Sequence, residues 1–136
     1  SIRAVSNATA IALSGLTAAT AMWNTNHNSN GVTVDESTGS ITVLVAGRYR
    51  VYLGIQSGTT TANERTAVYI SINGTQSSYL GVIMSIGSVY FNSVAVEGTF
   101  PLAANDVVDV DFLPLGAATT IIVANAELYV ELLELA

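Results

Sequence analysis

Short runs of β-branched and aromatic residues fill this chain, and turn-forming residues interrupt them about every ten positions. The interrupting residues are mostly glycine, asparagine, serine and threonine, since proline occurs only twice. No segment after residue 25 combines a helical hydrophobic period with caps at both ends. The pattern predicts an all-β sandwich or barrel, and the length of 136 residues predicts one domain over 1–136.

The clearest alternation lies in residues 37–53, which read STGSITVLVAGRYRVYL. Thr38-Gly39 and Ala46-Gly47 are typical turn dipeptides, so the stretch predicts a hairpin-like pair of strands. Because successive side chains of a strand point to opposite faces, the odd-numbered residues are expected to point inward. The inward set is Ile41, Val43, Val45, Tyr49, Val51, Leu53 and Ile55.

Further strands follow from similar runs. They are expected at 66–73, 77–85, 88–100, 106–112 and 126–135. Asn73-Gly74 predicts a type I′ hairpin turn because both residues tolerate positive φ, and Ala104-Asn105 predicts another turn. The segments 28–36, 56–65 and 114–125 resemble loops or short strands. Residues 8–22 fit a helix or a strand, and we favour a strand.

Composition excludes several classes of partner. The chain has ten acidic residues, four arginines and no lysine, for a formal net charge of −6. So few cations do not make the electrostatic footprint of a protein that binds nucleic acid or anionic membranes. No run reaches the roughly 18 uninterrupted apolar residues of a membrane-spanning helix, so membrane insertion is not expected. Half of the residues are nevertheless hydrophobic, and this surplus indicates a subunit interface.

The absence of cysteine excludes disulfide bonds and thiol chemistry. The sequence opens at Ser1 rather than at methionine, which suggests a product cut from a longer chain. Threonine and serine interrupt the apolar run at 8–22, and Arg3 is the only cation before it. A signal peptide is therefore not expected.

Few residues have the spacing that catalysis or metal binding requires. His27 is the only histidine, and it lies in NTNHNSNG, a polar segment without a nucleophile motif. One histidine without cysteine does not make a typical zinc site, and the glycines form no phosphate-binding motif. We therefore expect no catalytic residues, no cofactor and no metal, and we do not expect an enzyme.

Two acidic clusters leave calcium binding open as an alternative. Asp35-Glu36 is one, and Asp106, Asp109 and Asp111 form the other. Calcium prefers several oxygen ligands, which carboxylates supply. Asp109 and Asp111 share one face of a strand, however, and alternating acids usually belong to a hydrated outer face. We prefer that interpretation.

Five aromatic residues could form a platform for sugar binding. They are Trp23, Tyr52, Tyr79, Tyr90 and Tyr129. Aromatic side chains more often pack in a core or between subunits, and we prefer packing for each of them.

The order of these signals resembles one known family. A WN-x-N segment precedes TG-x-IT-V-x-x-x-G-x-Y-x-V, an L-x-x-x-D-x-V-x-V strand follows, and an apolar strand comes last. Over roughly residues 20–135 the chain is similar to the C1q/TNF-like jelly-roll family. The matching residues are Trp23, Asn24, Thr38, Gly39, Ile41, Val43, Gly47, Tyr49, Val51, Leu102, Asp106, Val108, Val110 and the strand from Leu128 to Leu135. The chain departs from the family in its VELLELA ending and in Ala46, where proline is usual.

The resemblance implies an antiparallel jelly-roll β-sandwich of about ten strands that forms a homotrimer. Members head fibrous or collagen-like stalks in animal complement and cytokine-like proteins, bacterial surface and spore-coat filaments and phage virions. The chain is thus expected to be a structural head domain on a virion or an extracellular bacterial surface, with 1–18 as its first strand or a stalk-proximal segment. The alternative is an adhesin that binds a host receptor or a glycan through loops at 56–65 and 114–125.

In the resembled fold, the strand near 48–56 shares a sheet with the strand near 90–100 and the C-terminal strand. The outward face of that sheet meets neighbouring subunits. The expected interface residues are Arg48, Arg50, Tyr52, Phe91, Glu97, Tyr129, Glu131 and Leu133. Arg50, with Arg48, is expected to pair with Glu131 or Glu97 and to set the register of the trimer. The alternative is a hydrated face with loose ion pairs.

Overall fold

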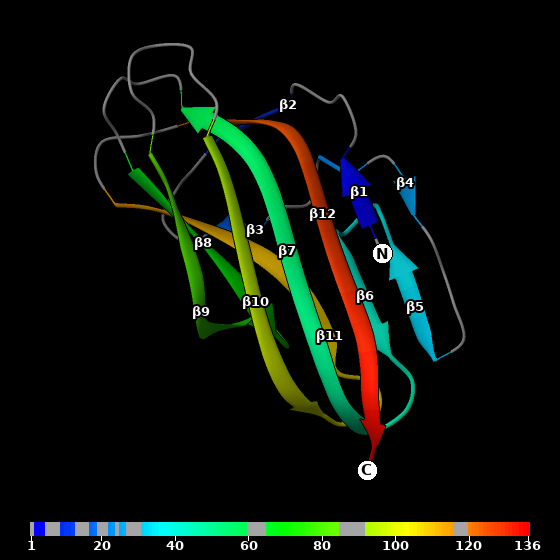
Figure 1. Ribbon diagram of the computed structural model, residues 1–136. Coiled ribbons are helices and arrows are strands. Elements are labelled where there is room, and N and C mark those ends of the chain that lie inside the picture. The colour runs from blue at the N-terminus through cyan, green and yellow to red at the C-terminus, as the bar shows by residue number, and fades with distance from the viewer. Residues whose placement is uncertain are drawn as a thin grey trace.

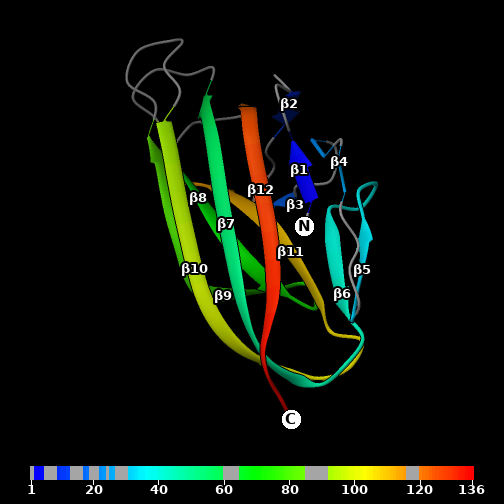
Figure 2. The ribbon, with the colours of Figure 1, turned by 45° about the vertical axis from the view of Figure 1, so that its right-hand side comes forward.

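The computed structural model describes residues 2–4, 9–12, 17–18, 22–23, 25–26, 31–59, 65–84, 92–115 and 120–136. Within these ranges the chain forms twelve β-strands and no helix. The strands build two antiparallel sheets that face each other (Figure 1 and Figure 2). The prediction of an all-β fold with antiparallel sheets is therefore confirmed.

The sheet that contains the C-terminal strand is built around β7. Its order is β10 (Asn92–Leu102), β7 (Gly47–Thr59), β12 (Thr120–Leu135), β1 (Ile2–Ala4) and β4 (Thr25–Asn26), and β2 (Thr9–Ala12) also pairs with β12. β10, β7 and β12 run side by side across the front of Figure 1. The prediction that these three strands share one sheet is confirmed.

The second sheet is built around β11. Its order is β5 (Val32–Asp35), β6 (Ser40–Val43), β11 (Val107–Pro114), β8 (Arg65–Ile72) and β9 (Thr75–Met84), and β3 (Thr17–Ala18) also pairs with β11. The strands predicted at 66–73, 77–85 and 106–112 are confirmed to within two residues at each end. The segment 28–36, predicted as a loop or a short strand, supplies β5.

Alternating side chains from both sheets fill the core between them. Val51 and Leu53 of β7 and Val108 and Val110 of β11 belong to one buried cluster, and all four are fully inaccessible. The odd-numbered residues predicted to point inward are buried, with the exception of Val45, which is 42% exposed. Val45 lies in the connection between β6 and β7, where no strand fixes its side.

The hairpin predicted within residues 37–53 is wrong, although both of its strands exist. β6 and β7 belong to different sheets, and residues 44–46 cross from one to the other. The Tyr49 hydroxyl donates to the carbonyl oxygen of Val45 over 2.6 Å and ties this crossing to β7. Gly47 is needed for a close approach rather than for a turn, because a Cβ there would lie 2.5 Å from the Glu134 carbonyl oxygen.

The last strand begins earlier than predicted. Residues 114–125 were expected to form a loop or short strands, but β12 starts at Thr120 and pairs with β7 from Ile121 onward. Ile121 and Val123 are fully buried. Residues 121–124 are four consecutive apolar residues, so the sequence lacks the alternation of apolar and polar residues that signals a half-exposed strand. β7 likewise extends to Thr59, into the predicted loop at 56–65.

The turns predicted at Asn73-Gly74 and Ala104-Asn105 are confirmed. Asn73 and Gly74 connect β8 to β9 with φ values of 52° and 79°, the sign that a type I′ turn requires at both positions. Asn105 lies between β10 and β11 with a φ of 73°. Asparagine tolerates this left-handed conformation better than most residues.

Candidate assembly surface on the sheet of β10, β7 and β12

The outward face of β10, β7 and β12 contains most of the residues predicted for a subunit interface. The strand register places Glu131 opposite Arg50 and Tyr129 opposite Tyr52 on one side of β7. On the other side it places Glu97 opposite Tyr52. Residues that lie directly opposite each other on one face of a sheet are within side-chain contact, so these five form one patch. We call it the front face.

Arg50 is held between carboxylates from both neighbouring strands. Its Nη2 donates to Oε2 of Glu131 over 2.5 Å, and its Nε lies 3.9 Å from Oε1 of Glu97. The three side chains keep 43%, 37% and 55% of their surface exposed, respectively. The partners expected for Arg50 are therefore its neighbours within one chain, and these ion pairs form without a second subunit.

Arg48 pairs with a different carboxylate than expected. Its Nη2 lies 3.2 Å from Oε2 of Glu134, rather than near Glu131 or Glu97. A β-bulge between Leu132 and Glu134 causes this change, since the extra residue shifts the register so that Glu134 opposes Arg48. Leu133 is the bulged residue and is 46% exposed.

Tyr52 and Tyr129 are cross-strand neighbours at the centre of the front face. Tyr129 is 36% exposed. The Tyr52 ring extends along its own strand and covers Gly54, where an added Cβ would lie 2.7 Å from the Tyr52 hydroxyl oxygen. Gly54 thus leaves room for the ring, and two aromatic side chains present apolar area to solvent.

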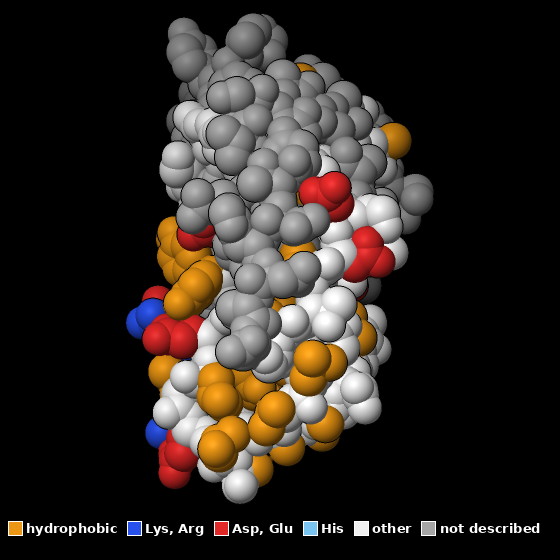
Figure 3. Space-filling view, turned by 90° about the vertical axis from the view of Figure 1, so that its right-hand side faces the viewer, with side chains coloured by type: hydrophobic (Ala, Val, Ile, Leu, Met, Phe, Trp, Pro, Cys, Tyr) orange, Lys and Arg blue, Asp and Glu red, His pale blue; other side chains and the backbone are white. Residues whose placement is uncertain are grey.

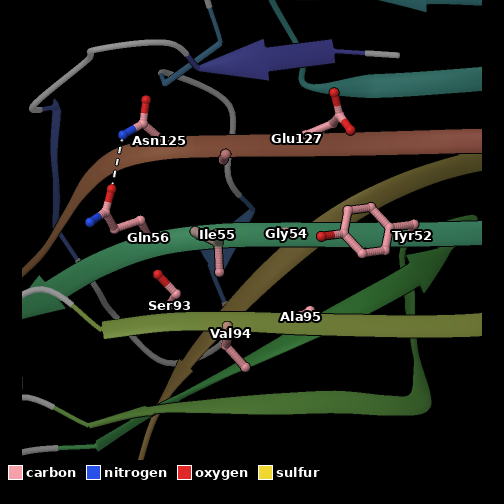
Figure 4. A pocket seen from close by; sticks show the side chains of 10 residues that line it. Tyr52, Gly54, Ile55, Gln56, Ser93, Val94, Ala95, Asn125 and Glu127 are labelled. Carbon is pink, nitrogen blue, oxygen red and sulfur yellow. Dashed lines mark hydrogen bonds between the residues drawn. The ribbon is translucent and has the colours of Figure 1, made fainter.

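A groove of about 610 Å³ continues the front face beyond the tyrosines (Figure 4). Two small residues, Gly54 and Ala95, lie opposite each other across the β7–β10 pair, and the Tyr52 ring lies over Gly54 at one side of the groove. Asn125 closes one end by donating to Oε1 of Gln56 over 2.9 Å. No pattern in the sequence predicted this groove. The two small residues were visible in the sequence, but their juxtaposition depends on the strand register.

Hydrophobic side chains are exposed where the front face ends near the C-terminus. Leu132, Leu133 and Leu135 are 42%, 46% and 65% exposed. Leu44 and Val45, in the connection between the sheets, are exposed to a similar degree. The side view in Figure 3 shows acidic and basic side chains together along one margin and hydrophobic side chains gathered on the lower half of this side.

The acidic residues of β11 do not form the hydrated outer face that we expected. Asp111 is 6% exposed, and its carboxylate accepts a hydrogen bond from the Ser71 hydroxyl of β8, which is fully buried. Within the described residues, Oδ1 of Asp109 is buried without a hydrogen-bond partner. Burial, and to a lesser extent the charge of Asp111, raises the pKa of Asp109 to about 6.

The other two aspartates of the acidic clusters serve turns. Asp106 accepts hydrogen bonds from the Asn73 side chain and the Ala103 backbone, which hold its pKa below the usual value. Asp35 accepts from Ser37, which lowers the pKa of Asp35. No three histidine, cysteine or acidic side chains converge as a metal site in the part of the chain that the structure describes. Calcium binding therefore remains an alternative without structural support there.

Of the aromatic residues considered as a sugar platform, Tyr52 and Tyr129 are neighbours on the front face, and the other two described ones lie elsewhere. Trp23 is 7% exposed and belongs to the core, and Tyr79 makes an edge contact with Phe100 at 5.1 Å between ring centroids. Packing, the interpretation we preferred, describes both. Three further residues named from the sequence, His27, Tyr90 and Phe91, lie outside the described residues.

The two loops assigned to an adhesin are shorter than the sequence suggested. The flanks of 56–65 belong to β7 and β8, and residues 120–125 belong to β12. Residues 60–64 and 116–119 lie outside the described part of the chain. Of the described positions in these two segments, Leu115 alone lies outside a strand, and its side chain is exposed.

No protein-family model matches this sequence, and no curated protein matches it either. Among the described residues, no helix is long and apolar enough to cross a membrane.

Proposed function

We propose that this chain is a non-enzymatic jelly-roll head domain that assembles as a homotrimer through its front face. The order of the strands supports the jelly-roll assignment. Among the described strands from β6 to β12 the chain alternates between the sheets, except that β8 and β9 follow each other within one sheet. Such repeated crossing between two antiparallel sheets is typical of jelly rolls, in which two Greek keys interlock.

The pairing of charges on the front face carries the proposal. Arg50 is neutralised by Glu131 and Glu97, and Arg48 by Glu134, before any second subunit arrives. Burying an unpaired charge is very unfavourable, whereas a paired and hydrogen-bonded charge can be covered at a smaller cost. A face of paired charges and two tyrosines can therefore be covered by another copy of the chain.

The exposed apolar residues support the same conclusion. Tyr129 lies on the front face and is 36% exposed, and Leu133, at the bulge between Leu132 and Glu134 of the same strand, is 46% exposed. Subunit interfaces are enriched in aromatic and apolar side chains at their centre, with charged groups at the rim. Placement at the tip of a fibrous or collagen-like stalk, on a virion or a bacterial surface, rests on the resemblance noted in the sequence.

Sedimentation velocity tests the proposal directly. We expect the protein to sediment at three times the 14.1 kDa mass of one chain. Tyr129→Glu should convert the trimer to a monomer because it places an unpaired charge inside the interface. Thr33→Glu, an exposed position on β5 of the other sheet, is the matched control and should remain trimeric. A wild-type protein that stays monomeric at high concentration would refute assembly.

A further inference from the structure

Two turns at the same end of the second sheet are joined through the side chain of Asn73. Its Nδ2 donates to Oδ1 of Asp106 over 2.9 Å, and its Oδ1 accepts from the backbone N–H of Val107 over 2.9 Å. The backbone N–H of Asn73 also donates to the Val107 carbonyl oxygen over 2.8 Å. Both the nitrogen and the oxygen of the Asn73 amide are thus held, by Asp106 just before β11 and by Val107, its first residue.

Asn73 is followed by Gly74, and this dipeptide has a specific chemical weakness. The backbone nitrogen of the following residue can attack Cγ of the asparagine side chain, forming a C–N bond and expelling ammonia. Water then opens the resulting cyclic imide to aspartate or isoaspartate. Glycine favours the attack because it has no side chain to obstruct the approach and allows the backbone wide rotation. Asn73 and Gly74 are both exposed, so water reaches this site.

We propose that Asn73 is a deamidation site of this protein and that Asp106 and Val107 control its rate by holding the side-chain amide. The Asn73 carboxamide must rotate to present Cγ to the nitrogen of Gly74. That rotation breaks its hydrogen bonds to both partners. The folded protein therefore deamidates at Asn73 only when the two turns separate.

The product of the reaction cannot restore the hydrogen bond to Asp106. The side chain of an aspartate at position 73 has no N–H to donate, and its carboxylate faces the carboxylate of Asp106. Like charges at this distance repel, and the hydrogen bond that keeps the Asp106 pKa low is lost. Isoaspartate also adds a methylene to the backbone of a two-residue turn whose φ angles are both positive. Each event thus loosens the connection between the β8–β9 and β10–β11 turns permanently.

Peptide mapping by mass spectrometry measures the reaction, since replacing the amide by a carboxyl changes the mass of the peptide that contains Asn73. We expect Asp106→Ala to accelerate deamidation at Asn73 by roughly thirtyfold, from the loss of one charge-assisted hydrogen bond and weakening of the second. Asp35→Ala is the matched control, because Asp35 is an exposed aspartate that caps a different turn. It should leave the rate unchanged.

The wild-type protein provides a second test that does not depend on the folding of a variant. The sequence has one other Asn–Gly step, at Asn30 and Gly31. In urea, Asn73 should deamidate at the same rate as Asn30. In the folded state the rate at Asn73 should be at least roughly thirtyfold below its rate in urea, for the same loss of hydrogen bonds. Equal rates at Asn73 in folded and unfolded protein, or an unchanged rate in Asp106→Ala, would overturn the proposal.

Discussion

The outer faces of the two sheets carry charge in opposite ways. On the front face, each described arginine of β7 lies beside a carboxylate from a neighbouring strand. On the outer face of β11, Asp109 and Asp111 lie two residues apart, and no arginine of the described residues forms an ion pair with them. Asp111 is instead satisfied by the Ser71 hydroxyl. Each arginine of the front face thus has a carboxylate partner, whereas the two aspartates of β11 have no arginine partner among the described residues.

The difference separates two uses of a sheet surface. A face of paired charges costs less to cover than a face of unpaired ones, so it suits contact with another protein surface. Protonation stabilises a face with adjacent, partly buried carboxylates, because it removes both the desolvation cost and the mutual repulsion of the charges. Mutation of paired residues on the front face should therefore affect assembly and stability. The contribution of the β11 face to stability should instead depend on pH.

The largest expected effect on the β11 face comes from removing the hydroxyl that satisfies Asp111. Ser71→Ala should lower the free energy of unfolding by about 2 kcal/mol, because it leaves a buried carboxylate without its donor. Urea denaturation measures this loss. Ser93→Ala, at an exposed position of β10, is the control and should change stability little. A Ser71→Ala protein as stable as the wild type would show that Asp111 does not depend on this hydroxyl.

The alternation of side chains made most of the fold predictable. It identified the strands and the inward faces, since burial of one face fixes the period of a strand. It could not assign β6 and β7 to different sheets, because pairing partners are not encoded in the period. It also missed the start of β12, where Ile121 and Val123 belong to a run without alternation.

The candidate site was predictable to the extent that it depends on strand parity. Arg50, Tyr52 and Glu131 share a face because of parity alone. The partner of Arg48 was wrong because a bulge at Leu133 changes the register, and a bulge leaves no clear signal in one sequence. The hydrogen bond to the buried Asp111 comes from Ser71, a residue forty positions away in the chain.

The next largest effect should appear as a pH dependence. The folded pKa of Asp109 is raised from 3.8 to about 6, so the folded state binds a proton more readily than the unfolded chain. Stability should therefore rise as pH falls from about 6 toward 4, and should be lower at neutral pH. The gain should be about 1–2 kcal/mol, since solvent reaches part of this side chain and weakens the effect.

Asp109→Asn isolates this contribution. The variant should be more stable than the wild type near neutral pH and should lose the stability gain between about pH 6 and 4. Asp106 and Asp35 behave in the opposite way, because their pKa values are lowered in the folded state. The stability that they contribute is lost only as pH falls below about 4. If Asp109→Asn kept the wild-type pH profile, Asp109 would not be the group that titrates.

A smaller effect is expected from breaking the balanced pair at the centre of the front face. Arg50→Ala leaves Glu131 and Glu97 without their common cation, but all three side chains are partly exposed. The loss in unfolding free energy should be about 1 kcal/mol in a monomeric background such as Tyr129→Glu. A loss above about 3 kcal/mol in that background would mean that the pair is already buried within one chain, which would contradict the exposure of its side chains.

The smallest effect is expected for the ion pair of Arg48 and Glu134, which tests how far the covered part of the front face extends. Their side chains are 59% and 67% exposed, so a double-mutant cycle with Arg48→Ala and Glu134→Ala should give a coupling of at most about 0.5 kcal/mol in the same monomeric background. In the assembled protein the coupling should grow if neighbouring subunits cover this end of the face, because a pair removed from water is screened less. Thermal denaturation of both forms provides the two values. An equal coupling in monomer and assembly would limit the covered part of the front face to the region around Arg50 and the two tyrosines.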